Sequence, residues 1–318
     1  MKQRFLNKAK TFLPFLSEAV AMRCDSIAFA RSFEHIEKEL LETEFQKLKS
    51  EQVIDYDFSA PDGAQAITHR RITQLGQAEW VDHYADDLPA FDVKAEESSV
   101  KTETFGGHYF WTVEELDATA MDPTIRLDAE RKKSAEDAMR RKHDRVAAVG
   151  SEKHGRTGFV NDEHVPLVTP ITGDFPNSSA DEVRADIQKL LRAVEINSGD
   201  NAKATHLGVD QGTWTILNQP YGDNNDRTLR QWLLENEDNL KEIYQWNYLD
   251  TADEAGTGPR LVAHQKGKDV VKYNAVIVSK ERAPQDDNLK VKVPVYGKTG
   301  FTEWRKPLYG AYMDGVGA

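Results

Sequence analysis

The sequence predicts a mixed α+β fold in which an extended, charged front half precedes a compact back half. Three features support this prediction: helical periodicity near the N-terminus, β-type runs between residues 65 and 112, and alternating helical and β segments after residue 180. With 318 residues, the chain is long enough for one large domain or two closely associated ones. It contains 39% hydrophobic and 30% charged residues, which is within the globular range, and it has no internal repeat or low-complexity linker.

The charge balance and the single cysteine argue against several classes of protein. The chain has 41 Lys and Arg against 53 Asp and Glu, and a net charge of −12 argues against a dedicated nucleic-acid binder, which usually carries a basic excess. Cys24 is the only cysteine, so we expect a reducing compartment without disulfides. No stretch approaches the roughly 18–20 apolar residues that cross a bilayer. The cationic start resembles a signal peptide, but Pro14 and Glu18 interrupt its apolar run, so we expect a cytoplasmic protein with an intact N-terminus.

The first 52 residues are predicted to be helical and heavily charged. Apolar residues recur there at spacings of three and four, which places them on one narrow stripe of a helix: Phe33, Ile36, Leu40, Leu41, Phe45 and Leu48. A narrow stripe on a polar helix needs a partner surface. The stripe can dock on its own domain, or the segment can be an arm that lies on a neighbouring subunit, and the sequence leaves both interpretations open.

Residues 53–100 are predicted to form a long polar β-hairpin after the turn-rich segment 57–63. The two β-type runs are residues 65–73 and 78–84, joined by Gln74-Leu-Gly-Gln77. Arms of about ten residues extend roughly 33 Å at 3.3 Å per residue. Few apolar side chains are available, and isolated two-stranded hairpins are marginal in water. The hairpin therefore either lies on its own domain or is completed by another chain.

A long helix is predicted in the middle of the chain. A further β-type run, Val100–Thr112, leads into Thr112-Val-Glu-Glu115, which has the pattern of a helix capping box. Asp122-Pro123 then opens a helix that Gly150 ends, and about 26 residues span roughly 39 Å at 1.5 Å per residue. Its apolar stripe is thin and rich in alanine, and its other faces are crowded with charges.

The back half is predicted to alternate short helices and strands. Ser179 or Asp181 caps a third helix that runs to about Val194 with a good core face. The other predicted segments are a strand at 205–209, helical segments at 214–217 and 229–234, and β-type runs at 243–248, 270–279, 289–295 and 302–308. The glycine-rich end, 310–318, is expected to be exposed.

Since no motif for catalysis, phosphate binding or metal binding is complete, we assign no catalytic, cofactor-binding or metal-binding residue. Gly297-Lys298-Thr299 has the end of a phosphate-binding loop, but Lys292 stands where that loop requires a glycine. Gly256-Thr-Gly258 is followed by Leu261 where a dinucleotide fingerprint needs its third glycine. One acid-rich patch could hold a divalent cation, although a solvated turn is the simpler interpretation; it comprises Asp82, His83, Asp86, Asp87 and Asp92.

The order of the predicted elements is more informative than any one of them: a charged arm, a long polar hairpin, a long straight helix and a compact α+β remainder. Short segments add detail to this order, namely Gly76-Gln-Ala-Glu-Trp80, Ala85-Asp-Asp-Leu-Pro89, Thr112-Val-Glu-Glu-Leu116, Gly155-Arg-Thr-Gly-Phe-Val-Asn161 and Phe301 to Val316. Both resemble the major capsid proteins of tailed double-stranded-DNA bacteriophages, whose Hong-Kong-97-type shell fold is shared with bacterial encapsulins. None of these segments is catalytic.

The resemblance implies a domain organisation for the whole chain. An N-terminal arm, an extended loop, a peripheral domain with a spine helix at about 123–149, an axial domain and a return to the peripheral domain are expected, in that order, at residues 1–52, 53–100, 101–180, 181–300 and 301–318.

The same resemblance implies a structural protein, not an enzyme, that assembles as hexamers and pentamers into an icosahedral shell around phage DNA. Its expected partners are other copies of itself, the portal, a separate scaffold or decoration protein, and packaged DNA bound without sequence specificity, with no membrane. Its expected location is the virion capsid, after assembly in the host bacterial cytoplasm. Candidate intersubunit ion pairs involve Arg70, Arg71, Asp86 and Asp87 on the hairpin. Two alternatives remain open: an encapsulin-like nanocompartment shell, and a metal-dependent enzyme that uses the Asp82–Asp92 patch.

Overall fold

The structure is a computed structural model, which describes residues 47–78, 80, 90–115, 117, 127–221 and 227–317. The apolar stripe predicted for the first 52 residues lies outside the described residues, except for Leu48. Residues 48–318 form one unit whose buried side chains gather in two hydrophobic cores.

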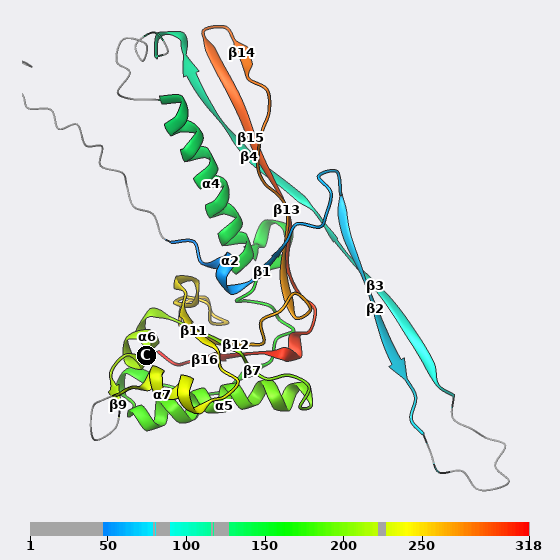
Figure 1. Cartoon of the computed structure of the whole chain (residues 1–318), viewed down its shortest axis with the longest axis vertical. Helices are drawn as coiled ribbons and strands as arrows, with labels where there is room; N and C mark the ends of the chain where they lie inside the picture. The colour runs from blue at the N-terminus through cyan, green and yellow to red at the C-terminus, as the bar shows by residue number, and fades with distance from the viewer. Residues whose placement is uncertain are drawn as a thin grey trace, which may run out of the picture. The chain divides into compact units, whose positions relative to one another are not determined.

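The first core is built on a five-stranded sheet (Figure 1). The strands lie in the order β1-β13-β15-β14, and β4 also pairs with β15. The first seven residues of strand β13 are buried, Lys272 and Asn274 among them, as expected for a central strand covered on both faces. The bounds are β1 Asp55–Asp57, β4 Glu103–Thr112, β13 Val271–Glu281, β14 Gln285–Asp287 and β15 Lys290–Trp304.

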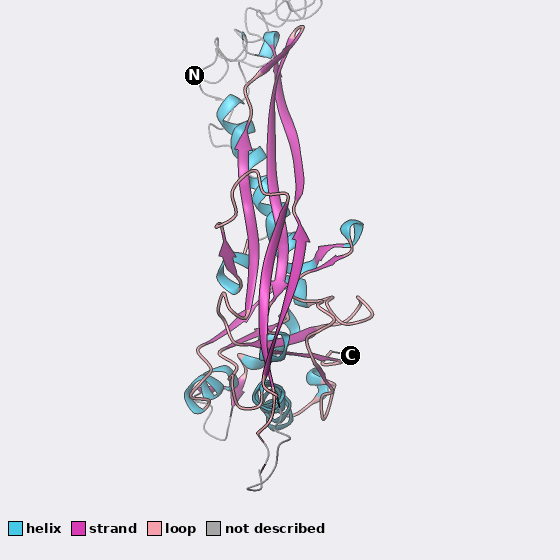
Figure 2. Cartoon of the chain, turned by 90° about the vertical axis from the view of Figure 1, so that its right-hand side faces the viewer, coloured by secondary structure: helices cyan, strands magenta, loops and turns pink. Residues whose placement is uncertain are grey.

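Helix α4, Leu127–Val149, runs along this sheet in the direction of its long strands (Figure 2) and confirms the predicted long helix. Its buried stripe is narrow and ends in small residues: Met139, Val146, Ala147 and Ala148. Small side chains let the helix approach β15 closely, and Thr302 on that strand donates a hydrogen bond to the Ala147 carbonyl at 2.8 Å. Gly150 then adopts a φ of 81°, in the left-handed region that favours glycine, and ends the helix as predicted.

The capping box predicted at Thr112 is present. The Thr112 N–H donates to Glu115 Oε2 at 3.0 Å, and the Glu115 N–H donates to Thr112 Oγ1 at 3.3 Å. Arg131 on α4 donates to the same carboxylate, with 2.9 Å from Nη2 to Oε1. The hydrogen bonds from Arg131 and from the Thr112 backbone lower the pKa of Glu115 to about 2. This carboxylate therefore ties the end of β4 to α4.

The second core lies beneath another five-stranded sheet, in the order β11-β8-β12-β16-β7. The strands are β7 Leu167–Val168, β8 His206–Val209, β11 Glu242–Gln245, β12 Arg260–His264 and β16 Gly310–Asp314. The strands predicted near 205 and 243 are confirmed, whereas β12 was not predicted. The expectation of an exposed end for residues 310–318 is wrong, because β16 pairs on both sides, with β12 and with β7, and four of its five residues are buried.

Helix α5, Ala180–Ser198, fills the second core together with α6, Gln211–Leu217, and α7, Leu229–Asn236. Ser179 caps α5: its side chain accepts from the Glu182 N–H, and its own N–H donates to Glu182 Oε2 at 2.8 Å. This decides between the two predicted caps in favour of Ser179. The helix runs four residues beyond the predicted end before Gly199 turns the chain.

The remaining elements are short. They are α2 Ser50–Val53, β5 Gly150–Ser151, β6 Arg156–Thr157, β9 Pro220–Tyr221 and β10 Arg227–Thr228, with single-turn helices at Glu152–His154, Phe175–Asn177, Asn247–Leu249 and Pro307–Tyr309.

A two-stranded hairpin projects from the rest of the unit (Figure 1). Its strands, β2 (Ala66–Leu75) and β3 (Asp92–Lys101), have ten residues each and pair in register from Ala66 with Lys101 to Leu75 with Asp92. The predicted pairing of residues 65–73 with 78–84 is therefore wrong. The partner strand lies further along the chain, where Phe91-Asp-Val-Lys-Ala95 alternates apolar and polar residues and fits a pleated strand better.

The division into arm, extended loop, peripheral domain and axial domain remains a prediction. In the structure, the described residues are grouped around two hydrophobic cores. By hydrogen bonding, residues 271–304 belong largely to the sheet of α4, and residues 310–314 belong to the sheet beside α5. The predicted limits at 181–300 and 301–318 follow the order of the chain, whereas the sheets combine segments that are distant in sequence.

Burial keeps histidines neutral inside this fold. His264 on β12 is fully buried beside Phe159, with ring centroids 5.0 Å apart. Burial, together with the neighbouring His206, lowers the pKa of His264 to about 3. His143 on α4 is held 2.7 Å from the Tyr273 hydroxyl, and burial lowers its pKa as well. Each of these side chains takes up a proton more readily in the unfolded chain than in the folded one.

This difference predicts a protein that loses stability in mild acid. A folded-state pKa below the unfolded value means that the free energy of unfolding falls as the pH drops from about 6.5 toward 3. We expect His264→Phe, which keeps a ring beside Phe159 but cannot titrate, to reduce the loss between pH 7.5 and 5.5 by about 1 kcal/mol. Urea unfolding at the two pH values measures this change. An equal loss in the variant and the wild type would contradict it.

Candidate functional site

The hairpin is attached near its base by an apolar contact made possible by a glycine. Ile67 on β2 packs against Gly300 on β15, where an added Cβ would lie 2.6 Å from Ile67 Cδ1. Val100, directly opposite Ile67 on β3, packs against the first core. A larger residue at position 300 would press on the end of the Ile67 side chain, which would then have to move.

Polar contacts attach the same face of the hairpin. His69 Nδ1 lies 2.7 Å from Glu303 Oε1, and Arg71 Nη2 donates to the Arg305 carbonyl at 2.5 Å. Residues 67, 69 and 71 alternate along β2, so their side chains share one face of the ribbon. One face of the hairpin near its base is therefore directed toward the body.

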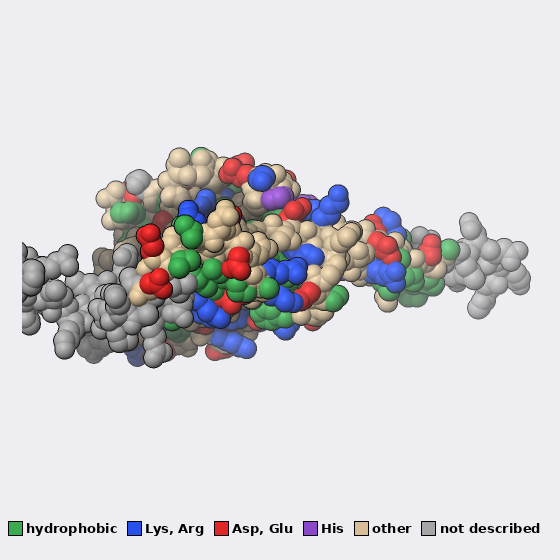
Figure 3. Space-filling model, turned by 90° about the horizontal axis from the view of Figure 1, so that it is seen from above, with side chains coloured by type: hydrophobic (Ala, Val, Ile, Leu, Met, Phe, Trp, Pro, Cys, Tyr) green, Lys and Arg blue, Asp and Glu red, His purple; other side chains and the backbone are tan. Residues whose placement is uncertain are grey.

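The opposite face carries exposed apolar side chains. Ile72 pairs with Ala95, and Val93 pairs with Gln74, which places them on the face away from the body. Ile72 is 69% exposed, Val93 59% and neighbouring Phe91 70%. Figure 3 shows hydrophobic side chains gathered along one side of the hairpin near its far end. Three large apolar side chains on a thin ribbon form a surface suited to contact with another molecule.

The structure places the predicted site residues in different surroundings. Arg70 Nε pairs with Glu97 Oε1 across the hairpin at 2.6 Å, on the outer face, whereas Arg71 lies on the face directed to the body. Asp86 and Asp87 lie outside the described residues, as do Asp82 and His83 of the acid-rich patch. The intersubunit pairing of these arginines and aspartates therefore remains a prediction.

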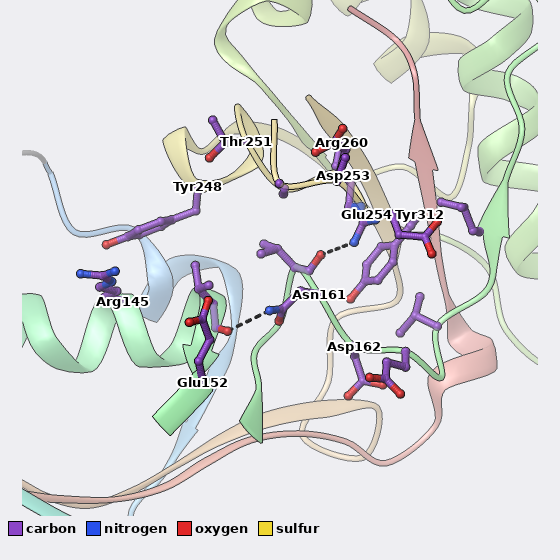
Figure 4. A pocket seen from close by; sticks show the side chains of 18 residues that line it. Arg145, Glu152, Asn161, Asp162, Tyr248, Thr251, Asp253, Glu254, Arg260 and Tyr312 are labelled. Atoms are coloured by element: carbon purple, nitrogen blue, oxygen red, sulfur yellow. Dashed lines mark hydrogen bonds between the residues drawn. The ribbon is translucent and has the colours of Figure 1, made fainter. Parts of the chain in front are cut away.

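A cavity of about 1050 Å³ lies in the body of the unit, at the end of α4 (Figure 4). Loop residues around Asn161 and around Asp253 form its walls, and acidic side chains outnumber basic ones: Glu152, Asp162, Glu163, Asp253 and Glu254 against Arg145 and Arg260. Its size is suitable for a small molecule, so the partners of its polar groups decide whether it can be a binding site.

The buried Arg260 is fully engaged in holding the fold. Its Nε and Nη2 atoms each lie 2.6 Å from an oxygen of Asp314, and Nη1 donates to the Val160 carbonyl at 2.7 Å. The guanidinium also stacks over the Tyr312 ring, 4.7 Å from its centroid. This bidentate pair joins β12 to β16 and fastens the loop that carries Val160.

Other polar side chains of the cavity form hydrogen bonds with the backbone of nearby loops. Asn161 accepts from the Gly158 N–H at 2.6 Å and donates to the Val149 carbonyl at 3.0 Å, drawn in Figure 4. Backbone N–H groups of residues 256–258 hold the pKa of Asp253 below its usual range. Within the described part of the chain, no group of three or more His, Cys, Asp or Glu side chains is placed to bind a metal ion. The arrangement supports a structural role for these polar side chains.

No helix among the described residues is long and apolar enough to cross a membrane. The exposed apolar face of the hairpin is the feature that the geometry singles out.

A comparison with protein families decides the family of the chain. The model of a family described as major capsid protein matches residues 76–316. The chain belongs to the major capsid protein family. A search of curated proteins finds no match.

Solved structures with the same fold include phage capsids. The capsid of Myoviridae phage XM1 matches with a TM-score of 0.81 at 16% identity, over 92% of this chain and 100% of that one. Mycobacterium phage Che8 matches with a TM-score of 0.61 at 12% identity, over 92% and 100%. The capsid of a native GTA particle matches with a TM-score of 0.63 at 13% identity, over 94% and 99%. At these identities, the likeness shows a shared fold.

Family and fold confirm the predicted Hong-Kong-97-type α+β capsid protein. The chain is a structural protein of a capsid shell, and its family indicates a role in assembly and not in catalysis. A capsid protein acts through contacts with copies of itself, so its functional site is a surface. The apolar residues of that surface, Ile72, Phe91 and Val93, were not among the site residues predicted from the sequence. The alternation of Phe91, Val93 and Ala95 was the signal that could have revealed them.

We expect the cavity's buried ion pair to matter for folding. Arg260→Met keeps a long side chain but leaves Asp314 largely buried without its partner, which should cost about 3–5 kcal/mol of unfolding free energy. Arg227→Met, which removes the partner of Glu235 in an exposed pair, is the control and should cost no more than about 1 kcal/mol. Urea unfolding of the two unassembled variants compares them. Equal costs would show that the Arg260 pair is not a structural link.

The outer face of the hairpin is expected to matter for assembly. Ile72→Thr combined with Val93→Thr retains β-forming residues and removes apolar surface, so each contact should lose about 1 kcal/mol per side chain. Light scattering across a protein dilution series should show assembly only at higher concentration. The swap Ile72→Val with Val93→Ile keeps the apolar surface and should assemble like the wild type. Unchanged assembly of the Thr variant would show that this face stays uncovered.

Proposed function

We propose that this chain assembles as hexamers and pentamers into a closed icosahedral shell that encloses the double-stranded DNA of a tailed phage. The observation that carries the proposal is a hairpin whose outer apolar face, Ile72, Phe91 and Val93, is exposed in the single chain. Membership of the major capsid protein family and the likeness to phage capsids over nearly the whole chain support it.

The shape of the contact supports rings. A hairpin that projects from one copy onto another makes a heterologous contact, in which two different surfaces meet. Heterologous contacts close into rings when their rotation permits, and rings of five and six can tile a shell. Each contact can be modest, because every copy makes several contacts and multivalency strengthens the whole.

The charges of the hairpin are proposed to add direction to this contact. Arg70 and Arg71 are proposed to form intersubunit ion pairs with Asp86 and Asp87. Arg70 would exchange Glu97 for an aspartate of another copy. Both side chains of the Arg70–Glu97 pair are more than half exposed, so they are accessible for this exchange. Exposed pairs are worth about 0–1 kcal/mol each, so they contribute less than the apolar face and act mainly on specificity.

The proposal includes a set of partners and a location. The shell would include a portal. A separate scaffold or decoration protein would assist its assembly in the host bacterial cytoplasm. The mature location would be the virion capsid. Packaged DNA would be held without sequence-specific contacts, which agrees with a net charge of −12 that discourages adhesion to DNA.

Expression of the chain alone tests the proposal. We expect size-exclusion light scattering to give masses far above the 35.9 kDa of one chain, and negative-stain electron microscopy to show shells, tubes or rings with five- and six-fold symmetry. Co-expression with a scaffold candidate is the second arm, since some shells require one. A chain that stays monomeric in both arms contradicts the proposal.

A further inference from the structure

Strand β15 has a strained backbone at the point where the base of the hairpin lies against it. Phe301 has a φ of 62°, in the left-handed region that bulky residues rarely adopt. Among the described residues, the other non-glycine residues with a positive φ are Asp200 and Asn288, which lie in turns. Phe301 instead lies inside a strand and is 2% exposed. Such strain persists only where neighbouring groups hold it.

The strain belongs to a β-bulge that the register of the sheet does not require. On one side of it Tyr273 pairs with Thr302, and on the other side Ile277 pairs with Lys298. These two pairs share one register, because each strand advances by four residues between them. Only the part of the ladder between them is displaced, by one residue. A regular ladder would therefore fit between the same two pairs.

A chain of hydrogen bonds that reaches α4 holds the bulged form. Phe301 has no paired residue on β13, and its N–H donates instead to Thr299 Oγ1 at 3.0 Å. The Thr299 hydroxyl donates to the Tyr273 hydroxyl at 2.8 Å, and His143 Nδ1 on α4 lies 2.7 Å from the same Tyr273 oxygen. The Thr299 hydroxyl thus supplies the partner that a buried N–H needs in the bulge.

The bulge decides which residue of β15 faces the hairpin. Thr299 now lies opposite Ala275 and shares its face of the sheet, so Gly300 faces the hairpin and Ile67 packs against it. In a regular ladder, Gly300 would lie opposite Ala275, and Thr299 would turn to the face of the hairpin. The Thr299 side chain would then take up the space of Ile67, whose Cδ1 lies 2.6 Å from where a Cβ on Gly300 would be.

We propose that residues 299–301 are a conformational switch between a bulged and a regular form of β15, and that this switch controls whether the hairpin is docked on the body. The bulged form leaves Gly300 bare for Ile67 and keeps Phe301 strained. The regular form relieves the strain and releases the base of the hairpin. The inference rests on the proposed shell and adds a control of its assembly, because only a docked hairpin presents its outer face in a fixed direction.

The contacts of the docked hairpin favour the bulged form. Val100 packs against the first core, and His69 Nδ1 lies 2.7 Å from Glu303 Oε1, two residues beyond the bulge. The hairpin makes these contacts while Ile67 is in place on Gly300, so they stabilise one form of β15 and not the other. By the same linkage, a change that weakens the bulge should loosen the hairpin, although the hairpin does not touch the changed residue.

Thr299→Val tests this linkage, because valine keeps the shape of threonine but removes the acceptor of the Phe301 N–H. Spin labels at Thr73 on the hairpin and Lys153 on the body, both exposed, report the direction of the hairpin after Cys24→Ser. Pulsed electron paramagnetic resonance on unassembled wild-type chains should give one main distance. We expect Thr299→Val to raise the population at a second distance about three- to tenfold, and to raise the concentration needed for assembly.

Thr302→Val is the matched control. It makes the same substitution on the same strand, but it removes a hydroxyl that donates to the Ala147 carbonyl of α4 at 2.8 Å, outside the bulge. This control should keep the single distance of the wild type. Circular dichroism verifies folding, and Gly300→Val serves if Thr299→Val unfolds, because valine favours an extended strand and has no room beside Ile67 in the bulged form.

The outcomes separate the switch from the shell. A single wild-type distance in folded Thr299→Val would show that the bulge is a fixed feature, and would overturn the inference. An equal second distance in Thr302→Val would assign the effect to a general loss of packing and would overturn it too. A second distance in Thr299→Val alone, together with a wild type that forms no particles with or without a scaffold, would uphold the switch and reject the shell.

Discussion

The structure depends on one sheet that is buried on both faces. Strand β12 directs Leu261 and Ala263 into the core of α5 and Val262 into the core that includes the end of α4, and β16 divides its residues in the same way. All five residues of β12 are buried, so water cannot supply hydrogen bonds to a polar side chain on this strand. This explains why Arg260, at the start of β12, is satisfied by Asp314 and by a backbone carbonyl. The two cores are held together because they share these strands.

The hairpin is the opposite case, because it contributes little to either core. Ile67 and Val100 attach its base, and beyond Arg71 its side chains are largely exposed. A two-stranded ribbon with one apolar face gains stability when another surface covers that face. In a family whose members form shells, the covering surface is another copy. The part of the molecule with the fewest internal contacts is therefore the part available for function.

Charges follow the same division between body and surface. In the body, Lys272 lies 2.6 Å from Asp57 and joins β13 to β1; although burial opposes it, this hydrogen bond and those from Ser59 hold the pKa of Asp57 at about 2. Around the hairpin, Arg70 pairs with Glu97, and both side chains are more than half exposed. Buried pairs stabilise the subunit, whereas exposed pairs contribute little stability and act mainly on specificity between subunits.

The sequence by itself determined the local features: the capping box at Thr112, the end of α4 at Gly150 and the order of hairpin, long helix and α+β remainder. These depend on spacings of a few residues, and the order was enough to indicate the capsid family. Tertiary structure decided which segments pair. The β-type residues at 78–84 led to a wrong partner for the first hairpin strand, and the glycines at 310–317 led to the expectation of an exposed end where β16 lies. Both predictions failed because strand pairing depends on partners that are distant in sequence. The hydrogen bond from Arg71 to the Arg305 carbonyl likewise joins residues 234 positions apart, which only the packing of the hairpin beside β15 brings together.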